Sequence, residues 1–153
     1  DSRVSAELIC DGIHLHPAVI NLTYQQLVAK GRDEALPIFI SDSMEATGLS
    51  DGQYQLGGLD VIKKGNKATL TDGVPIASSV TNLIDCMLCV VKNTGLTLFE
   101  AVNACSLHPA LFLGVAEEQF GAIEAGSYAD LVLVDADLNI KYVIQQGKVA
   151  YIK

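Results

Sequence analysis

Two short segments near the start of the chain are apolar throughout, which limits the kinds of sheet they can join. They cover residues 6–10 and 36–40, and residues 19–30 between them carry apolar side chains at helical spacing. A strand with one face in water alternates apolar and polar residues, whereas a parallel strand covered on both faces is apolar throughout. The first 45 residues therefore predict a strand, a helix and a second strand of a parallel α/β sheet.

Short strands separated by turn residues predict antiparallel hairpins in the rest of the chain. The expected strands occupy residues 59–63, 67–71, 129–135, 140–144 and 148–152. Gly65-Asn66 and Gln146-Gly147 each separate two of these segments, and glycine-containing dipeptides of this kind favour the tight turn of a hairpin.

Two helices are predicted between these groups of strands. An apolar stripe at intervals of three and four residues predicts a helix that begins at Ser79. Thr97 and Glu100 have the spacing of a capping box, in which each side chain accepts a hydrogen bond from the backbone of the other. A second helix should therefore begin at Thr97 and end before Pro109, because proline disfavours a helical conformation in the residue before it.

A change in composition near residues 113–121 predicts a domain boundary. Residues 1–115 combine parallel-type strands and helices with a hairpin insertion near 54–71, and residues 116–153 are mostly strands. Two parallel strands and three helices cannot close a sheet, and three further strands make only part of a sandwich. We therefore expect the chain to be the C-terminal part of a larger fold.

Composition excludes several classes of protein. Ten Lys and Arg against eighteen Asp and Glu give a formal charge of −8, which opposes binding to nucleic acid or to an anionic membrane surface. Half of the residues are hydrophobic and 18% are charged, so the chain is not intrinsically disordered. Because no apolar run has the length of a membrane span and no leader-like segment opens the sequence, we expect a cytoplasmic protein.

Cysteine and histidine patterns raise two metal-site hypotheses. Cys86 and Cys89 could form half of a zinc site, but a second pair at matching spacing is missing and both cysteines lie in the expected helix. His14 and His16 alternate along the chain, so their side chains could point to one side and bind a metal together. Without a third ligand nearby, we favour two loop histidines and reduced, buried thiols.

A carboxylate at the end of the second apolar segment is the sharpest catalytic candidate. Asp42 follows residues 36–40 after a single serine, Ser41, and the residues after it predict a loop. In a barrel of parallel strands, a carboxylate at the C-terminal end of a strand faces the mouth of the active site. A turn or capping aspartate would explain this position equally well.

Three motifs occur in an order that resembles the family of N-acetylglucosamine-6-phosphate deacetylases. These motifs are DGIHLHPAVI (11–20), SDSMEATGLSDGQYQLGG (41–58) and DGVPIASS (72–79). The segment SLHPALFLG (106–114) is similar to another motif of that family, and FGAIEAGSYADLVLVD (120–135) resembles a strand of the wider amidohydrolase superfamily. The resemblance covers residues 4–152.

The resemblance implies a fold and a reaction. The chain would be the C-terminal part of a (β/α)8 metallohydrolase barrel together with part of a small β-sandwich domain. The complete enzyme would hydrolyse the acetamide of N-acetylglucosamine 6-phosphate to glucosamine 6-phosphate and acetate, in amino-sugar catabolism. Its cofactor would be a divalent metal, zinc or iron.

The resemblance also assigns roles in the family's active site to individual residues of this sequence. Asp42 matches the family's catalytic aspartate, and His14 matches a histidine that contacts the sugar phosphate. The loop that contacts the amino sugar corresponds to Pro75, Ile76 and Ala77, where this sequence departs from the usual Leu-Ala/Ser-Gly. His108 stands where the family usually has asparagine, and we expect a structural, capping role for it.

The resemblance also implies partners. The family's metal-coordinating glutamate and histidines precede the region that matches Asp1, so we expect no metal ligands in this chain and no activity from it alone. The missing N-terminal half of the barrel would supply them. The complete enzyme would form a homodimer, with the neighbouring subunit contributing to the phosphate pocket.

Three alternatives remain open. Another amidohydrolase, such as a dihydroorotase-like enzyme or a deaminase, would share Asp42 and the strand at 129–135 but would not need DGIHLHPAV. A non-catalytic remnant or binding module would also fit a chain without metal ligands. A zinc-binding structural protein is the third, and a metal assay would reveal it.

Overall fold

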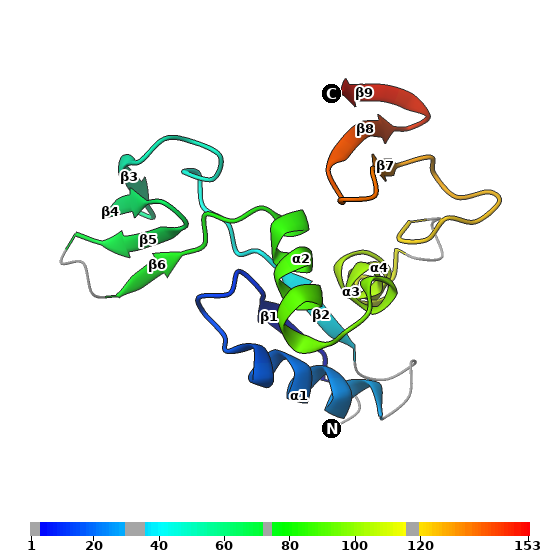
Figure 1. Ribbon diagram of the computed structural model, residues 1–153, viewed down its shortest axis with the longest axis horizontal. Helices are drawn as coiled ribbons and strands as arrows, with labels where there is room; N and C mark the ends of the chain where they lie inside the picture. Colours follow the sequence, from blue (N-terminus) through cyan, green and yellow to red (C-terminus); the bar gives the residue numbers. More distant parts are fainter. Residues whose placement is uncertain (1–3, 30–35, 72–74, 116–119) are drawn as a thin grey trace. The chain divides into compact units, whose positions relative to one another are not determined.

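The computed structural model describes residues 4–29, 36–71, 75–115 and 120–153. The chain divides into two compact units, residues 1–109 and 110–153. The first unit begins with the elements β1 (Ala6–Ile9), α1 (Pro17–Val28), β2 (Pro37–Ile40), β3 (Gly52–Leu56), β4 (Leu59–Lys64), β5 (Lys67–Leu70) and β6 (Ile76–Ser78) (Figure 1). The first unit continues with α2 (Leu83–Thr94) and α3 (Leu98–Cys105), and α4 (Leu107–Phe112) spans the boundary between the units. The second unit contains β7 (Leu131–Val134), β8 (Ile140–Gln145) and β9 (Lys148–Ile152).

A parallel strand pair joined by a helix opens the first unit. Strands β1 and β2 pair in parallel from Ala6 opposite Pro37 to Ile9 opposite Ile40. Helix α1 connects them, with Pro17 as its first residue and His16 as its N-cap. Proline suits this position because its missing N–H would have no partner within the helix. The strand–helix–strand order expected from the apolar segments is therefore what the structure shows.

Helices α1, α2 and α3 all contact β2 and bury a single core. The buried residues of this core are Leu8, Cys10, Ile20, Tyr24, Phe39, Cys86, Met87, Val90, Leu96, Ala101 and Ala104. Phe39 of β2 is 2% exposed, and its ring lies 6.0 Å from that of Tyr24 on α1. Burial of this apolar area is the main force that holds the helices on the strand pair.

An antiparallel sheet of strand order β3-β4-β5-β6 follows β2 in the chain. Lys64 and Lys67 form the last pair before the Gly65-Asn66 turn, and Gly65 has a φ of 60°. The predicted hairpin is present, and β3 and β6 extend it at both edges. A second buried cluster joins the sheet to the segment after β2 and consists of Met44, Ala46, Val61, Ala68 and Val80.

Helix α2 begins later than its apolar stripe suggested. The predicted start at Ser79 is wrong: the N-cap is Asn82, whose side chain accepts a hydrogen bond from the backbone N–H of Asp85. Ser79 instead forms a β-bridge with Ser43, and Val80 packs into the second cluster. Pairing with another segment therefore overrides helical spacing at these positions.

Helix α3 begins at the predicted capping box. The Thr97 hydroxyl accepts from the backbone N–H of Glu100, and the Glu100 carboxylate accepts from the backbone N–H of Thr97. Replacement of Thr97 by alanine leaves the Glu100 N–H without its partner. We expect Thr97→Ala to lower the free energy of unfolding by about 1 kcal/mol, measured by urea denaturation. Thr97→Ser, which keeps the hydroxyl, should lose much less, and equal losses would contradict the cap.

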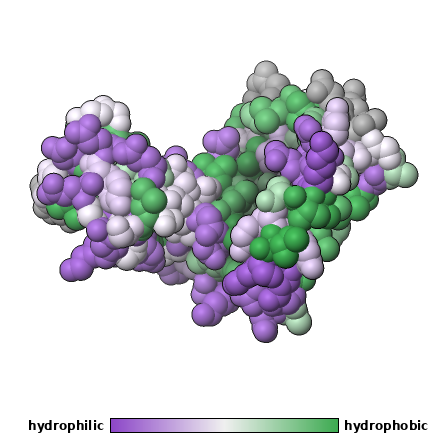
Figure 2. Space-filling view, turned by 90° about the horizontal axis from the view of Figure 1, so that it is seen from above, coloured by the Kyte–Doolittle hydropathy of each residue, from purple (hydrophilic) through white to green (hydrophobic). Residues whose placement is uncertain are grey.

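The second unit contains the antiparallel sheet β7-β8-β9. Gln146 and Gly147 form the turn between β8 and β9 with φ values of 49° and 74°, as a two-residue turn with both central residues at positive φ requires. Many large apolar side chains are exposed on this sheet, including Val132, Val149 and Ile152. Figure 2 shows hydrophobic residues gathered in patches on the surface of the chain.

Among the described residues, no helix combines the length and the apolar character that a membrane span requires.

Candidate functional site

The predicted site residues follow the carboxyl ends of β1 and β2. Because the two strands are parallel neighbours, these ends lie at the same edge of the pair. The ladder continues past β1, where the backbone N–H of Cys10 donates to the carbonyl of Ile40 at 3.1 Å. The loop that holds His14 and the loop that holds Asp42 therefore start side by side. This edge is where parallel α/β folds place their ligand sites.

Asp42 has a backbone conformation that few residues other than glycine adopt. Its φ is 50°, in the left-handed region, which aspartate tolerates better than most residues. Its carbonyl oxygen accepts hydrogen bonds from the Ser78 hydroxyl and, at 3.0 Å, from the backbone N–H of Ser79. The side chain is exposed, and no hydrogen bond or ion pair engages its carboxylate among the described residues. A fixed backbone thus presents a free carboxylate, an arrangement that clusters at functional sites.

The segment expected to contact the sugar leads into the residues that pair with Asp42. Ile76 and Ala77 belong to β6, and Pro75 directly precedes it. The chain then continues into Ser79, whose carbonyl accepts from the backbone N–H of Met44 at 2.9 Å. This pairing, which the sequence did not predict, joins the end of β6 to the segment that holds Asp42. Ile76 and Pro75 are exposed, and Ala77 is half-buried.

His14 is held by a buried carboxylate in its own loop. One Asp11 carboxylate oxygen lies 2.8 Å from the Nδ1 atom of His14. The other oxygen accepts from the backbone N–H groups of Ile13 and His14, at 2.9 and 3.0 Å. Burial by itself raises the pKa of Asp11, but these backbone N–H groups and the His14 side chain outweigh it and lower that pKa below its usual value.

Sequence reasoning included Asp11 only as the first residue of the motif at 11–20 and missed this contact. The available signal was its position: Asp11 follows the first apolar segment closely, as Asp42 follows the second. The carboxyl edge therefore carries an aspartate on each of two neighbouring strands, one buried and paired with His14 and one exposed.

The histidine pair has two separate structural roles. His16 caps α1, and its Nδ1 atom accepts from the backbone N–H of Ala18 at 3.2 Å, whereas His14 faces Asp11. His108 was expected to cap a helix, but its Nδ1 atom lies 2.7 Å from the carbonyl oxygen of Pro37. Because a carbonyl oxygen only accepts, the Nδ1–H group of His108 donates to it. His108 therefore links α4 to the start of β2.

The residues described by the structure do not form a metal site by themselves, since no group of three or more His, Cys, Asp or Glu side chains among them is placed to hold an ion. Cys86 lies buried in α2, and Cys89 lies one turn further along. Burial raises the pKa of Cys86 and of Cys105 to about 12. These two thiols are therefore protonated at neutral pH in the metal-free chain.

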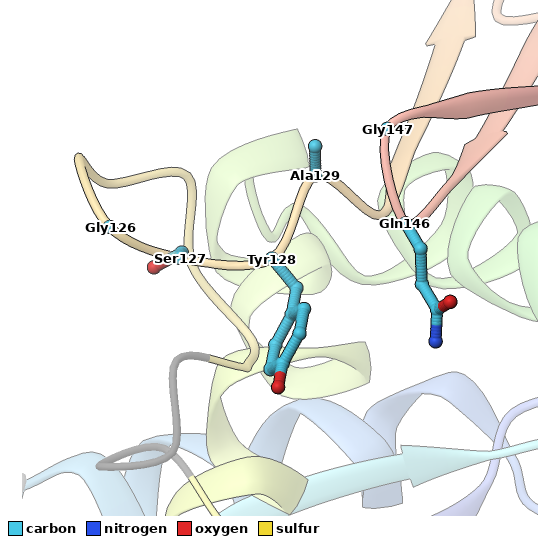
Figure 3. Close-up of a pocket in the computed structure, with 6 residues that line it drawn as sticks. All are labelled: Gly126, Ser127, Tyr128, Ala129, Gln146 and Gly147. Carbon is cyan, nitrogen blue, oxygen red and sulfur yellow. The ribbon is translucent and has the colours of Figure 1, made fainter.

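A hollow of about 480 Å³ lies in the second unit, apart from the predicted residues. Gly126, Ser127, Tyr128, Ala129, Gln146 and Gly147 line it (Figure 3). Among the described residues its lining contains no carboxylate, histidine, lysine or arginine, so it offers no acid–base side chain for amide hydrolysis. We therefore place the candidate site at the carboxyl edge of β1 and β2.

Comparison with known proteins shows the family to which the chain belongs. Residues 2–150 match the amidohydrolase family. The chain belongs to that family. An N-acetylglucosamine-6-phosphate deacetylase of Bacillus subtilis is 36% identical over 95% of this amidohydrolase chain and 35% of its own length. An N-acetylgalactosamine-6-phosphate deacetylase of Escherichia coli O157:H7 is 35% identical over 98% of the chain and 38% of its own length.

A solved structure matches the fold as well. It is a mutant N-acetyl-D-glucosamine-6-phosphate deacetylase from Mycobacterium smegmatis in complex with N-acetyl-D-glucosamine-6-phosphate. The two share 33% identity and a TM-score of 0.86 over 97% of this chain and 38% of the other. The resemblance drawn from the three motifs is confirmed, and the chain spans a little over one third of these relatives.

Proposed function

We propose that this chain is the C-terminal part of an enzyme that hydrolyses the acetamide of N-acetylglucosamine 6-phosphate. The proposal rests on two loops that follow the carboxyl edge of β1 and β2 and hold His14 and Asp42, in a chain 33–36% identical to deacetylases of that name. Residues 75–77 lie in and just before β6, whose end pairs with the segment that holds Asp42. The products would be glucosamine 6-phosphate and acetate.

Asp42 is the group we assign to proton transfer. Its carboxylate would accept a proton from the attacking water as the water oxygen bonds to the carbonyl carbon. It would then return that proton to the amide nitrogen as the C–N bond breaks, so the amine leaves in neutral form. A positioned general acid–base of this kind contributes roughly 10²–10⁴-fold in rate. The exposed, unpaired carboxylate and its fixed backbone support this role.

His14 and residues 75–77 would position the substrate. A protonated His14 would donate a charge-assisted hydrogen bond to a phosphate oxygen. The exposed residues Pro75 and Ile76, with Ala77 behind them, would border the sugar. Contacts at the phosphate, far from the scissile bond, hold the acetamido group in place for attack.

We propose that residues outside this chain bind the divalent metal, zinc or iron, that the motif resemblance implies. The described residues do not offer a sufficient donor set. When bound, such an ion would polarise the acetamide carbonyl and make the water more acidic. On this proposal the chain alone is inactive.

We propose that parts of the enzyme outside this chain also cover its exposed apolar surface. Residues 1–115 would be the last strands and helices of a (β/α)8 barrel, and residues 116–153 would be part of a small β-sandwich. Side chains such as Phe99 and Phe112 are 68% and 57% exposed, and apolar patches usually mark surfaces that contact other protein segments. The rest of the barrel and a second subunit of a cytoplasmic homodimer would cover them.

Acetate release by the complete protein tests the proposed function. We expect turnover of N-acetylglucosamine 6-phosphate, with a kcat/KM at least tenfold higher than for unphosphorylated N-acetylglucosamine, because the charge-assisted contact to the phosphate is worth about 1.5–3 kcal/mol. Activity on a dihydropyrimidine ring or an aminopurine, with none on either acetamido sugar, would contradict the proposal.

N-acetylgalactosamine 6-phosphate is a second candidate substrate, favoured by the 35% identity to a relative named for it. The two sugars differ only in the configuration of one hydroxyl group. Parallel assays with both sugar phosphates therefore decide between them, and the higher kcat/KM identifies the substrate.

A further inference from the structure

The most completely buried charged group near the proposed site is one that the mechanism above does not use. The Asp11 side chain is 1% exposed, and that of its partner His14 is 19% exposed. A buried carboxylate is costly unless its oxygens are hydrogen-bonded. Both oxygens of Asp11 have partners: two backbone N–H groups on one and the His14 ring on the other.

This geometry determines which nitrogen of His14 carries a proton. An ionised carboxylate can only accept hydrogen bonds, so the Nδ1 atom at 2.8 Å must be the donor. The Nε2 atom on the other side of the ring is then the one that remains for a ligand. Because backbone N–H groups hold the carboxylate itself, the ring cannot rotate without breaking a contact that the loop has already fixed.

We propose that Asp11 is a positioning residue: its carboxylate accepts from Nδ1–H of His14 and holds the ring so that, in the protonated ring, Nε2–H is the donor to a substrate phosphate. This inference rests on the proposed function and deepens it, because it names the residue that prepares the phosphate contact. It assigns Asp11 no contact with the substrate. A residue that hydrogen-bonds one ring nitrogen of a functional histidine sets the orientation of the ring and the position of its proton.

Asp11→Asn separates this role from a purely structural one. The asparagine Oδ1 atom can still accept from the backbone N–H groups of Ile13 and His14, so the loop keeps those two bonds. Its NH₂ group replaces the second oxygen, and a donor then faces Nδ1. The neutral His14 ring should therefore switch to the Nε2–H form, which a purely structural role in the loop would not require. A protonated ring would point Nδ1–H at this donor, so the variant should keep only an uncharged Nε2–H contact with the phosphate.

The first measurement is ¹⁵N NMR of His14 in the complete protein, at a pH at which the ring is neutral, with the His14→Gln variant used to assign the signal. We expect the Nδ1–H form in the wild type and the Nε2–H form in Asp11→Asn. An Nε2–H ring in the wild type would overturn the proposal, and this result does not depend on whether the variant folds.

The second measurement is steady-state kinetics of acetate release. For Asp11→Asn we expect KM for N-acetylglucosamine 6-phosphate to rise about fivefold to tenfold, as the exchange of a charged donor for a neutral one implies, with kcat within about threefold. The kcat/KM for unphosphorylated N-acetylglucosamine should be unchanged. Equal losses on both substrates would show a structural role and overturn the proposal.

Two controls complete the test. Asp135→Asn removes a carboxylate that also accepts from backbone N–H groups and from a cationic side chain, Lys141, but lies in the second unit. This variant should leave KM for N-acetylglucosamine 6-phosphate at the wild-type value.

Titration with inorganic phosphate, followed by the NMR signal of His14, tests the site without turnover. If acetate is not released but phosphate still shifts His14 in the wild type and less in Asp11→Asn, only the proposed reaction fails; no shift in the wild type overturns the positioning role.

Discussion

Asp42→Asn should reduce kcat for acetate release by about 10²-fold or more, with little change in KM, because it removes the base and keeps the shape. Asparagine also tolerates the left-handed backbone that Asp42 adopts at a φ of 50°. The backbone contacts of residue 42 with Ser78 and Ser79 should therefore survive. The measurement is steady-state kinetics of the complete protein with N-acetylglucosamine 6-phosphate.

Asp60→Asn is the matched control for this loss of one negative charge. Asp60 lies on β4 in the same unit, and its carboxylate accepts only from the side chain of Gln55 among the described residues. Its replacement should leave kcat within about twofold, as a surface substitution away from the chemistry does. Retention of more than about a tenth of kcat by Asp42→Asn would make Asp42 a turn residue, because that loss is too small for an essential proton shuttle.

Phe39→Ala should produce the largest loss of stability. Phe39 lies at the centre of the core between the parallel strands and α1–α3, 2% exposed and against the ring of Tyr24. Truncation to alanine removes most of that buried area and leaves a cavity, which costs about 3–5 kcal/mol. We expect this decrease in the free energy of unfolding from urea denaturation of the complete protein.

Phe39→Leu is the graded comparison, because it retains most of the volume and should cost much less, about 1–1.5 kcal/mol. Equal losses for the two variants would mean that the ring contributes through a specific contact instead of through buried volume. A loss below 1 kcal/mol for Phe39→Ala would mean that this core is not continuous in the complete protein.

Much of the site could be predicted from the sequence because it depends on local signals. Asp42 was found because a carboxylate closely followed an apolar strand, and His14 because its motif resembled a known family. Asp11 carried the same local signal and was overlooked, since the choice between a turn residue and a buried partner depends on burial. Burial is a property of the folded neighbourhood, and no residue spacing reports it.

The sequence by itself determined the elements whose causes are local. Apolar runs, a capping box at Thr97 and Glu100, and turns at Gly65-Asn66 and Gln146-Gly147 each follow from nearest-neighbour sterics and hydrogen bonding. Only the tertiary structure decided where long-range pairing prevails. It held Ser79 and Val80 extended against the segment after β2 instead of in a helix, and so joined the end of β6 to the segment that holds Asp42. Pairing across 35 residues depends on which backbone groups meet after folding, and no local pattern contains that information.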